Sequence, residues 1–240
     1  MATLSLNKLV KTYNGRPVVN SVNLNIEDSS VVGLLGPNGA GKTTTFYITI
    51  GIIKADKGRV LLDDEDITNY PMYLRARRGV GYLPQETSIF RKLTVKQNIM
   101  AILEILPISK SEQKERTYML LDELGIKQLA EQKANLLSGG ERRRLEIARS
   151  LATNPSFILL DEPFAGIDPL AVIDIKKIIW HLKKRGIGIL ISDHNVRETL
   201  EVCDKAYILN DGKIIESGSP QKIATSETAR RIYLGDEFKL

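Results

Sequence analysis

Short, continuous apolar runs recur along the chain and alternate with longer stretches of helical spacing. The runs are Val31–Leu35, Phe157–Leu160 and Ile187–Ser192. Apolar runs without polar alternation are typical of strands that are covered on both faces, as in a parallel sheet. Helical spacing lies between the runs, at Thr43–Ile50, Gly140–Leu151 and Leu170–Lys184. The alternation of strands and helices predicts an α/β fold with a mostly parallel core sheet.

The first sixty residues follow a different pattern, because apolar and polar positions alternate loosely there. Leu4–Val10, Val18–Ile26 and Gly58–Leu62 have this alternation. Strands with one face toward a core and one toward water have this period of two. We therefore expect an antiparallel β piece at the N-terminus.

Residues 94–136 are charged and helix-prone, and they contain no strand-like run. Pro107 ends a helix, and Ser109 or Ser111 can cap the next one. We expect one domain, with a core at 1–85 and 137–219, an inserted helical lobe at 86–136 and a C-terminal tail at 220–240. The tail is predicted to be a short helix followed by a loose end.

Composition and charge narrow the class of protein only slightly. The chain has 240 residues, of which 42% are hydrophobic, enough for a sizeable core. Its net charge is +5, but the basic runs 142–144 and 183–185 are expected to be solvated helix faces, so no nucleic-acid partner is expected. The single cysteine, Cys203, is expected to be a small core residue and fits a cytosolic chain.

Membrane insertion is not predicted. The N-terminus lacks a basic segment followed by a long apolar run, so no signal peptide is expected. No window approaches the ~20 apolar residues that span a bilayer. If the protein serves a membrane, we expect it to do so through a partner.

The segment Gly36-Pro37-Asn38-Gly39-Ala40-Gly41-Lys42-Thr43 fills every fixed position of a phosphate-binding loop. An apolar run precedes it and a helical pattern follows it, as that motif requires. Glycines let backbone N–H groups wrap around a phosphate, and the helix start adds a positive end. Lys42 is expected to contact the terminal phosphates and Thr43 to hold Mg²⁺. A glycine-rich surface turn, the structural alternative, would not need all of these residues.

Two carboxylates, Asp161 and Glu162, follow the apolar run Phe157–Leu160. In open α/β sheets ligands bind at the carboxyl ends of the strands, which is where Asp161 is predicted to lie. We expect Asp161 to hold Mg²⁺ opposite Thr43, and Glu162 to polarise an attacking water. An acidic turn after a core strand is the structural alternative.

A second helix is predicted to begin at the segment Leu137-Ser138-Gly139-Gly140-Glu141, which places two glycines in its first turn. Ser138 is a good N-cap, but two glycines in a helix each cost roughly 0.8–1 kcal/mol in its interior. A bare helix start of this kind can bind an anion. Because the phosphate loop already has its own helix, a second such start is best explained if it completes the site of another copy of the chain.

In this order, these motifs resemble those of the ATP-hydrolysing subunits of ABC transporters, from about Leu4 to Gly218. The resemblance implies a P-loop NTPase of the ABC ATPase type, with ATP and Mg²⁺ as cofactors. It also implies a dimer whose two chains share their ATP sites. Many members end the signature with Gln where this chain has Glu141, and we expect little loss of function from that difference.

The same resemblance assigns roles to residues that are weak signals when they are taken singly. Tyr13 would stack on adenine, and Thr44 would belong to the nucleotide-binding loop. Gln85 would sense Mg²⁺ and the attacking water, and His194 would contact the γ-phosphate. Ala165-Gly166-Ile167-Asp168 resembles the loop that crosses the dimer interface.

A narrower resemblance points to the lipopolysaccharide-export ATPases of Gram-negative bacteria. It rests on the segments 82–95, 137–149 and 231–240. It implies a homodimer beneath two transmembrane permease subunits, held indirectly on the cytoplasmic face of the inner membrane. Phe90 and Arg91 are candidate permease contacts, although a loop anchor and a solvated charge would also account for them.

Two other functions fit parts of the pattern. ATPases of branched-chain amino-acid importers share much of it, and some soluble ABC-type ATPases serve metal-cluster assembly. The transported molecule is not shown by these residues, because membrane subunits select it.

Overall fold

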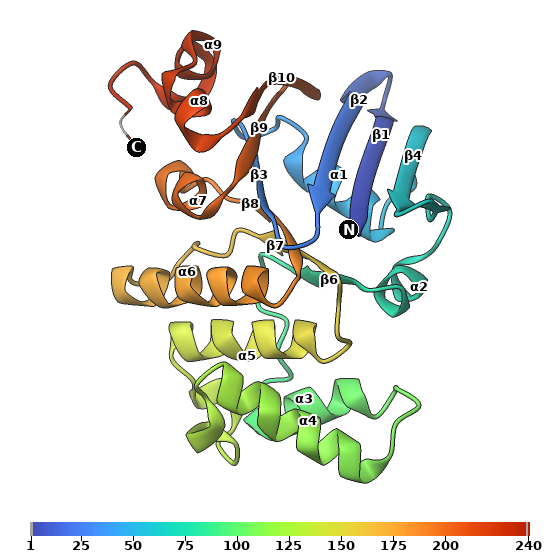
Figure 1. The fold of residues 1–240 in the computed structure, drawn as a ribbon, viewed down its shortest axis with the longest axis vertical. Helices are drawn as coiled ribbons and strands as arrows, with labels where there is room; N and C mark the ends of the chain where they lie inside the picture. Colours follow the sequence, from blue (N-terminus) through green and yellow to red (C-terminus); the bar gives the residue numbers. More distant parts are fainter. Residues whose placement is uncertain (1, 239) are drawn as a thin grey trace.

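Two sheets form the framework of the chain in a computed structural model that describes residues 2–238 and 240. The first sheet has the order β2-β1-β4-β5 and is antiparallel. Its strands are β1 (Thr3–Tyr13), β2 (Arg16–Glu27), β4 (Lys57–Leu62) and β5 (Glu65–Asp66). The predicted antiparallel piece at the N-terminus is confirmed (Figure 1).

The second sheet has the order β10-β9-β3-β8-β7-β6, and only its edge strand β10 runs antiparallel to its neighbour. Its strands are β3 (Val31–Leu35), β6 (Val80–Leu83), β7 (Phe157–Asp161), β8 (Gly188–Ser192), β9 (Lys205–Asn210) and β10 (Lys213–Gly218). Every residue of β3, β7 and β8 is buried, as their continuous apolar runs predict. The predicted α/β class with a mostly parallel core sheet is confirmed.

The two faces of this sheet pack against different helices. Ile158 and Leu160 of β7 lie in one core cluster, together with residues of α5 and α6. Phe157 and Leu159 point the other way, into a cluster with the antiparallel sheet and Phe46 of α1. Helix α1 therefore covers one face of the core sheet, and α5 and α6 cover the opposite face (Figure 1).

The helices lie between and after these strands along the chain. They are α1 (Lys42–Ile50), α2 (Met72–Arg77), α3 (Val95–Leu103), α4 (Lys110–Glu123), α5 (Gly139–Leu151), α6 (Pro169–Lys184), α7 (Val196–Val202), α8 (Pro220–Thr225) and α9 (Glu227–Ala229). Short 3₁₀ turns occupy Lys127–Leu129 and Ala134–Leu136, and a π-helical turn occupies Arg230–Leu234.

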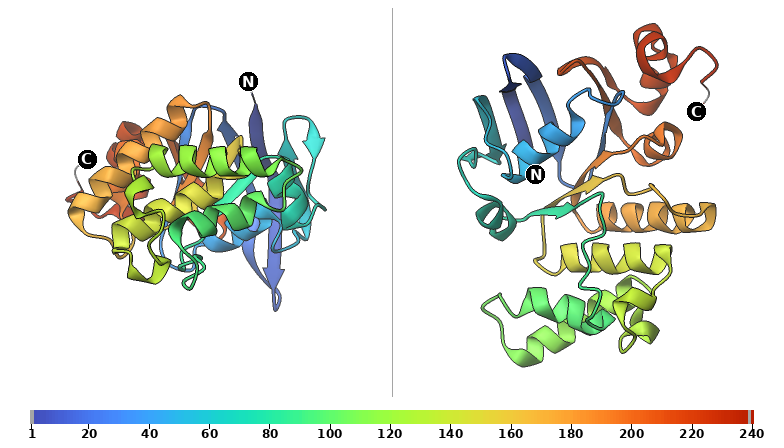
Figure 2. Two further views of the ribbon diagram at one scale, coloured as in Figure 1. Left: turned by 90° about the horizontal axis from the view of Figure 1, so that it is seen from below. Right: turned by 180° about the vertical axis from the view of Figure 1, so that it is seen from behind.

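The lobe helices α3 and α4 lie beyond α5, on its side away from the sheets (Figures 1 and 2). Thr94 and Gln97 form a capping box at the start of α3, and Ser109 rather than Ser111 caps α4. Helix α5 packs on both lobe helices and on β6, so it joins the lobe to the core sheet.

The tail is more ordered than the predicted short helix with a loose end. Residues 220–234 form the successive helical pieces α8, α9 and the π-helical turn. Ile223 and Ala229 are buried, and Tyr233 packs against the same cluster. The helical part is longer than predicted because these apolar side chains pack against residues of β9 and α7, whereas residues 235–238 have no regular secondary structure.

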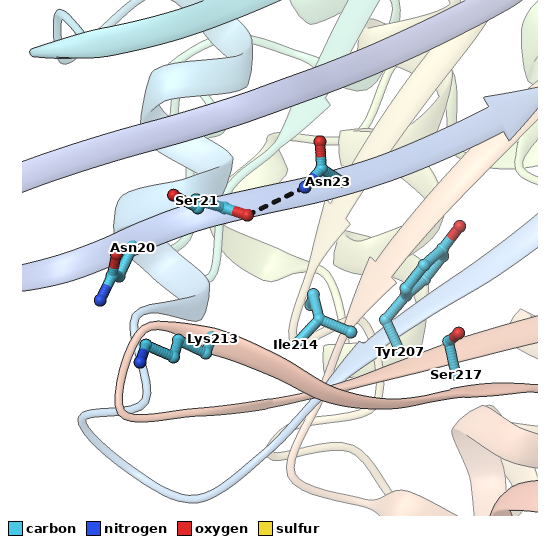
Figure 3. A pocket seen from close by; sticks show the side chains of 7 residues that line it. All are labelled: Asn20, Ser21, Asn23, Tyr207, Lys213, Ile214 and Ser217. Atoms are coloured by element: carbon cyan, nitrogen blue, oxygen red, sulfur yellow. Dashed lines mark hydrogen bonds between the residues drawn. The ribbon is translucent and has the colours of Figure 1, made fainter.

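A polar groove of about 530 Å³ lies where the two sheets meet. Asn20, Ser21 and Asn23 of β2 line one wall, and Tyr207, Lys213, Ile214 and Ser217 from β9 and β10 line the other (Figure 3). None of the predicted site residues lines this groove.

Candidate functional site

The predicted phosphate loop connects the end of β3 to the start of α1. Gly36 has φ 149°, and a Cβ atom there would lie 2.0 Å from the carbonyl oxygen of Leu209, so only glycine fits. The ammonium of Lys42 donates to the carbonyl oxygens of Gly36 at 2.6 Å and Pro37 at 3.1 Å. The loop thus curls around its own lysine, whose hydrogen bonds a bound phosphate could take over.

Charge around Lys42 links this loop to the predicted metal site. Burial lowers the pKa of Lys42, and the charges of Glu162, Asp161 and Asp193 oppose that effect. These carboxylates lie on or after β7 and β8; β8 pairs with β3 in the sheet, and β7 is the next strand beyond β8. Strand order therefore brings the phosphate loop and the two predicted carboxylates together at one edge of the sheet.

Asp161 is the last residue of β7 and is only 3% exposed. Burial raises its pKa to about 6, and the neighbouring charge of Glu162 adds to the rise. The hydroxyl of Tyr82 donates to the carboxylate at 3.4 Å. A buried carboxylate beside a second one gains most from a bound cation.

The residues at this edge fit a magnesium ion. Carboxylate, hydroxyl and amide oxygens are hard ligands of the kind Mg²⁺ prefers, and Asp161, Thr43 and Gln85 supply one each. Among residues 2–238 and 240, no group of three or more His, Cys, Asp or Glu side chains could hold a metal. Phosphate and water would therefore have to complete the shell, as they commonly do for Mg²⁺.

Glu162 has a strained backbone and lies at the centre of the predicted catalytic group. Its φ is 48°, in the left-handed region, and its N–H donates to the carbonyl oxygen of Ser192 at 2.6 Å. The carboxylate accepts a hydrogen bond from Gln85 at 2.8 Å and lies 3.4 Å from Nδ1 of His194. The structure thus brings together all three residues predicted to be catalytic. Backbone strain of this kind is frequent at active sites.

The signature segment begins α5 on the other face of the sheet. Ser138 caps the helix in a reciprocal box with Glu141, whose pKa is lowered by the hydrogen bonds to Ser138. A Cβ atom at Gly139 would meet nothing within 4 Å, so no contact within the chain requires glycine there. In the described part of the chain, no hydrogen bond or ion pair joins residues 137–141 to residues 36–44.

Comparison with known proteins decides the family. The family model described as ABC transporter matches residues 19–165, more than half of the chain. This chain belongs to the ABC transporter family. Proteins named lipopolysaccharide export system ATP-binding protein LptB are 54% identical in Haemophilus influenzae and 56% identical in Escherichia coli K12, over 100% of this chain and of each relative.

Solved structures of ABC ATPases share the fold along nearly the whole chain. The ADP conformation of MJ1267, an ATP-binding cassette of an ABC transporter, has a TM-score of 0.87 at 30% identity and covers 98% of this chain and 100% of its own. A dimeric post-hydrolysis state of the cassette MJ0796, bound to ADP and Pi, has a TM-score of 0.78 at 26% identity, with 90% and 98% covered. The identification as an ABC ATPase rests on both kinds of match.

Other predicted residues of this ABC ATPase lie at exposed or interfacial places. Tyr13 ends β1, is 43% exposed, and has the ammonium of Lys11 5.5 Å from its ring centroid. Asp168 caps α6 by accepting from the N–H of Ala171 at 3.0 Å. A cavity of about 100 Å³ is lined by residues from three of the predicted site segments, among others by Gln85, Gly139, Glu162, Ala165, Gly166 and Ile167.

Arg143 lies against the candidate site although the sequence pattern did not mark it. The run 142–144 was expected to be a solvated face, but Arg143 is 7% exposed. Consecutive helical residues project about 100° apart, so three in a row cannot share one face. The Arg143 guanidinium donates to the carbonyl oxygens of Asp161 at 3.1 Å and Glu162 at 3.2 Å, and it pairs with Glu146 at 3.0 Å. It therefore holds the backbone that carries Glu162, the predicted catalytic carboxylate.

Phe90 is held in place although it is half exposed. The buried Asn98 amide accepts from the Phe90 N–H at 2.8 Å and donates to its carbonyl oxygen at 3.1 Å. The guanidinium of Arg149 lies 4.5 Å from the ring centroid and donates to the carbonyl oxygen of Ser88. The side chain of the neighbouring Arg91 is exposed. An aromatic ring fixed at the surface is suited to contact a partner.

Proposed function

We propose that this chain is the ATP-hydrolysing subunit of a lipopolysaccharide exporter. The observation that carries the proposal is identity of 54–56% along the full length of relatives named lipopolysaccharide export system ATP-binding protein. The match spans the lobe and the tail as well as the nucleotide site, because it covers 100% of both chains.

The site geometry supports a specific division of labour in hydrolysis. Lys42 and the loop N–H groups would bind the β- and γ-phosphates, and Thr43, Asp161 and Gln85 would hold Mg²⁺. Glu162 takes a proton from the attacking water while the water oxygen bonds to the γ-phosphorus and the bond to ADP breaks. His194, beside Glu162, would contact the γ-phosphate.

The two helix starts support a dimer that shares its ATP. Helix α1 and the phosphate loop lie on one face of the core sheet, and α5 with the signature lies on the other. A single chain therefore cannot place both helix starts on one nucleotide. Two copies arranged head to tail can, because the signature of one copy then faces the phosphate loop of the other. The open space over Gly139 leaves room for that approach. The loop Ala165–Asp168 would lie between the copies.

Transport of a molecule across a membrane would require separate permease subunits. Within the described part of the chain, no helix is long and apolar enough to cross a membrane. Phe90 and Arg91 lie between Gln85 and the lobe helix α3, where a partner's cytoplasmic helix could sense the nucleotide state. We infer that the homodimer lies on the cytoplasmic face of the inner membrane through such contacts.

The amino-acid importer and the metal-cluster assembly alternatives are less well supported. Both fit the fold and the ATP site equally well. Relatives that are 54–56% identical over nearly the whole of both chains carry the lipopolysaccharide-export name, which favours export.

The test is purification of the protein from its native membrane in mild detergent, with partners identified by mass spectrometry. Export predicts two permease subunits in equal amount and ATP hydrolysis stimulated by lipopolysaccharide. Amino-acid permeases, or soluble partners alone, would refute the export assignment and leave the ATPase mechanism standing.

Phe90→Ala is expected to reduce recovery of the permeases at least tenfold while the isolated chain keeps its ATPase activity. A fixed, half-exposed aromatic of this kind is typical of an interface hot spot, for which truncation costs about 2 kcal/mol or more. Trp180→Ala is the matched control, because Trp180 on α6 is 43% exposed against 45% for Phe90. Equal recovery with both variants would remove Phe90 from the interface.

A further inference from the structure

Asp193, which directly follows β8, is a buried carboxylate with none of the roles assigned to Asp161 and Glu162. It is 0% exposed, although the neighbouring His194 is exposed. Taking a carboxylate out of water costs free energy unless donors inside the protein replace the lost water. The donors that hold Asp193 therefore indicate what this side chain does beside the candidate site.

The two carboxylate oxygens of Asp193 accept hydrogen bonds from two different segments. One oxygen accepts from the N–H of Asn195 at 2.8 Å, in a local turn of the kind that Asp side chains commonly form. The other accepts from the N–H of Phe164 at 2.9 Å, 29 positions away in the sequence. A local turn needs only the first of these bonds. The second bond ties the end of β8 to the segment that leaves β7.

Asn195 approaches the other backbone group of Phe164. Asn195 is the N-cap of α7, but its side chain does not cap that helix, which is the usual role of asparagine there. Its amide nitrogen instead lies 3.5 Å from the carbonyl oxygen of Phe164, at the long limit of a hydrogen bond. The Phe164 side chain is 2% exposed and belongs to the core cluster that includes residues of α5 and α6. Phe164 is thus held by its side chain and by both of its backbone groups.

Phe164 lies between two parts of the predicted site along the chain. Two residues before it, Glu162 has the strained φ of 48°. The carbonyl oxygen of Glu162 accepts from the N–H of Ala165 at 3.2 Å, in a turn that encloses Phe164. The predicted interface loop, Ala165–Asp168, begins directly after it. The place at which Phe164 is held therefore influences the position of Glu162 and of the loop.

His194 lies on the opposite segment, between the two residues that hold Phe164. Its Nδ1 atom is 3.7 Å from the carboxylate of Asp193 and 3.4 Å from that of Glu162. The connection through Phe164 therefore joins the backbone that carries His194 to the backbone that carries Glu162.

We propose that Asp193 is a positioning residue for ATP hydrolysis: its carboxylate holds the Phe164 backbone against the end of β8. The base Glu162 and the γ-phosphate contact His194 thereby keep a fixed spacing, so the proposal rests on the roles proposed for those two residues. A misplacement of about 1 Å can slow a reaction about 10²-fold. The phosphate loop follows a different strand, β3, and takes no part in this connection. Asp193 therefore acts on the rate of hydrolysis rather than on nucleotide affinity.

The test compares Asp193→Asn with the parent chain. Asparagine has nearly the same shape but only one acceptor oxygen, so its NH₂ group has to face one of the two N–H donors. We expect kcat to fall about 10- to 100-fold, while MgATP binds with the parent affinity. Asp204→Asn is the matched control, because Asp204 also accepts a backbone N–H, that of Val31 at 2.8 Å, but at the start of β3. The control is expected to keep the parent kcat.

Hydrogen exchange at the Phe164 amide supplies a second readout. It is expected to be slow in the parent and in Asp204→Asn, and faster in Asp193→Asn. A parent-like kcat in Asp193→Asn would overturn the proposal. An equal loss of kcat and of MgATP affinity would also overturn it, because the substitution would then disturb the whole site.

Two more variants complete the experiment. If Asp193→Asn does not fold, Asn195→Ala decides, because it removes only the longer contact with Phe164; a lower kcat at unchanged affinity is expected, and a parent-like kcat would overturn the proposal. Glu162→Gln separates this proposal from the assigned chemistry. Near-normal turnover in Glu162→Gln would refute the assigned base and the proposal with it. Loss of turnover in Glu162→Gln but not in Asp193→Asn would refute the positioning role alone.

Discussion

Replacing Glu162 by Gln is the perturbation that tests the assigned chemistry most sharply. Glutamine has nearly the same shape, so it can keep the contacts of the Glu162 carboxylate, which lies 2.8 Å from the Gln85 amide nitrogen and 3.4 Å from Nδ1 of His194. It cannot take a proton from water. Loss of a general base slows a reaction by about 10²–10⁴-fold, which corresponds to roughly 2.7–5.4 kcal/mol in the barrier. We expect kcat to fall within that range.

Nucleotide binding is expected to survive this change. The charge of Glu162 raises the pKa of Asp161, so its removal favours the ionised Asp161 that Mg²⁺ requires. Single-turnover hydrolysis of labelled ATP measures the chemical step, and equilibrium binding of a fluorescent ATP analogue measures affinity. Near-normal turnover in Glu162→Gln would refute the assignment of Glu162 as the base. A large loss of affinity would instead show a role in binding.

Two further predictions concern the rest of the site. Burial raises the pKa of Asp161 from 3.8 to about 6. Without Mg²⁺, the native state therefore loses stability as the pH rises from 3.8 to about 6, because the folded chain holds this proton more tightly than the unfolded chain. Above pH 6, Asp161→Asn should be the more stable chain by about 3 kcal/mol, the free energy that corresponds to this shift. Urea unfolding at low and neutral pH checks the sign, and a less stable variant at neutral pH would show that the charged form is stabilised. Arg143→Met leaves the buried Glu146 without its cationic partner, with only the Ser88 N–H still donating to the carboxylate, and should cost about 3–5 kcal/mol. Most of that loss should be recovered in Arg143→Met/Glu146→Leu, as denaturant midpoints would show; equal stability of both variants would contradict this.

Much of the core could be predicted because its signals are local. The runs around β3, β7 and β8 lack alternation, and the complete loop 36–43 specifies a strand before it and a helix after it. Ser138 was predicted as a cap and is one. The positions of Gln85, Glu162 and His194 beside each other were expected from the resemblance to ABC ATPases, and the strand order explains them, since β6, β7 and β8 are neighbours.

Other features depend on contacts between distant segments. Strand β9, with the sequence KAYILN, has four buried residues, Ala206–Leu209, but it is short and follows an irregular segment. Arg143 looks like a surface charge until α5 is placed on the ends of β6 and β7. The tail pattern was too weak to predict packing, because its apolar side chains find their partners on β3, α7 and β9. Tertiary contact, not local preference, decides such positions.

If two chains share each ATP site, the signature segment of one chain contacts the γ-phosphate held by the phosphate loop of the other. The most direct measurement therefore identifies the chain whose signature segment lies at the γ-phosphate. Lys42→Ala chains carrying a size tag are mixed with chains that have an intact phosphate loop. An ATP analogue with a photoreactive group on its γ-phosphate is then added with Mg²⁺ and illuminated. Shared sites predict that the Lys42→Ala chain, unlabelled when alone, becomes labelled near Ser138–Glu141 in the mixture. Label confined to the chain with the intact loop would contradict the account, because each site would then be complete within one chain.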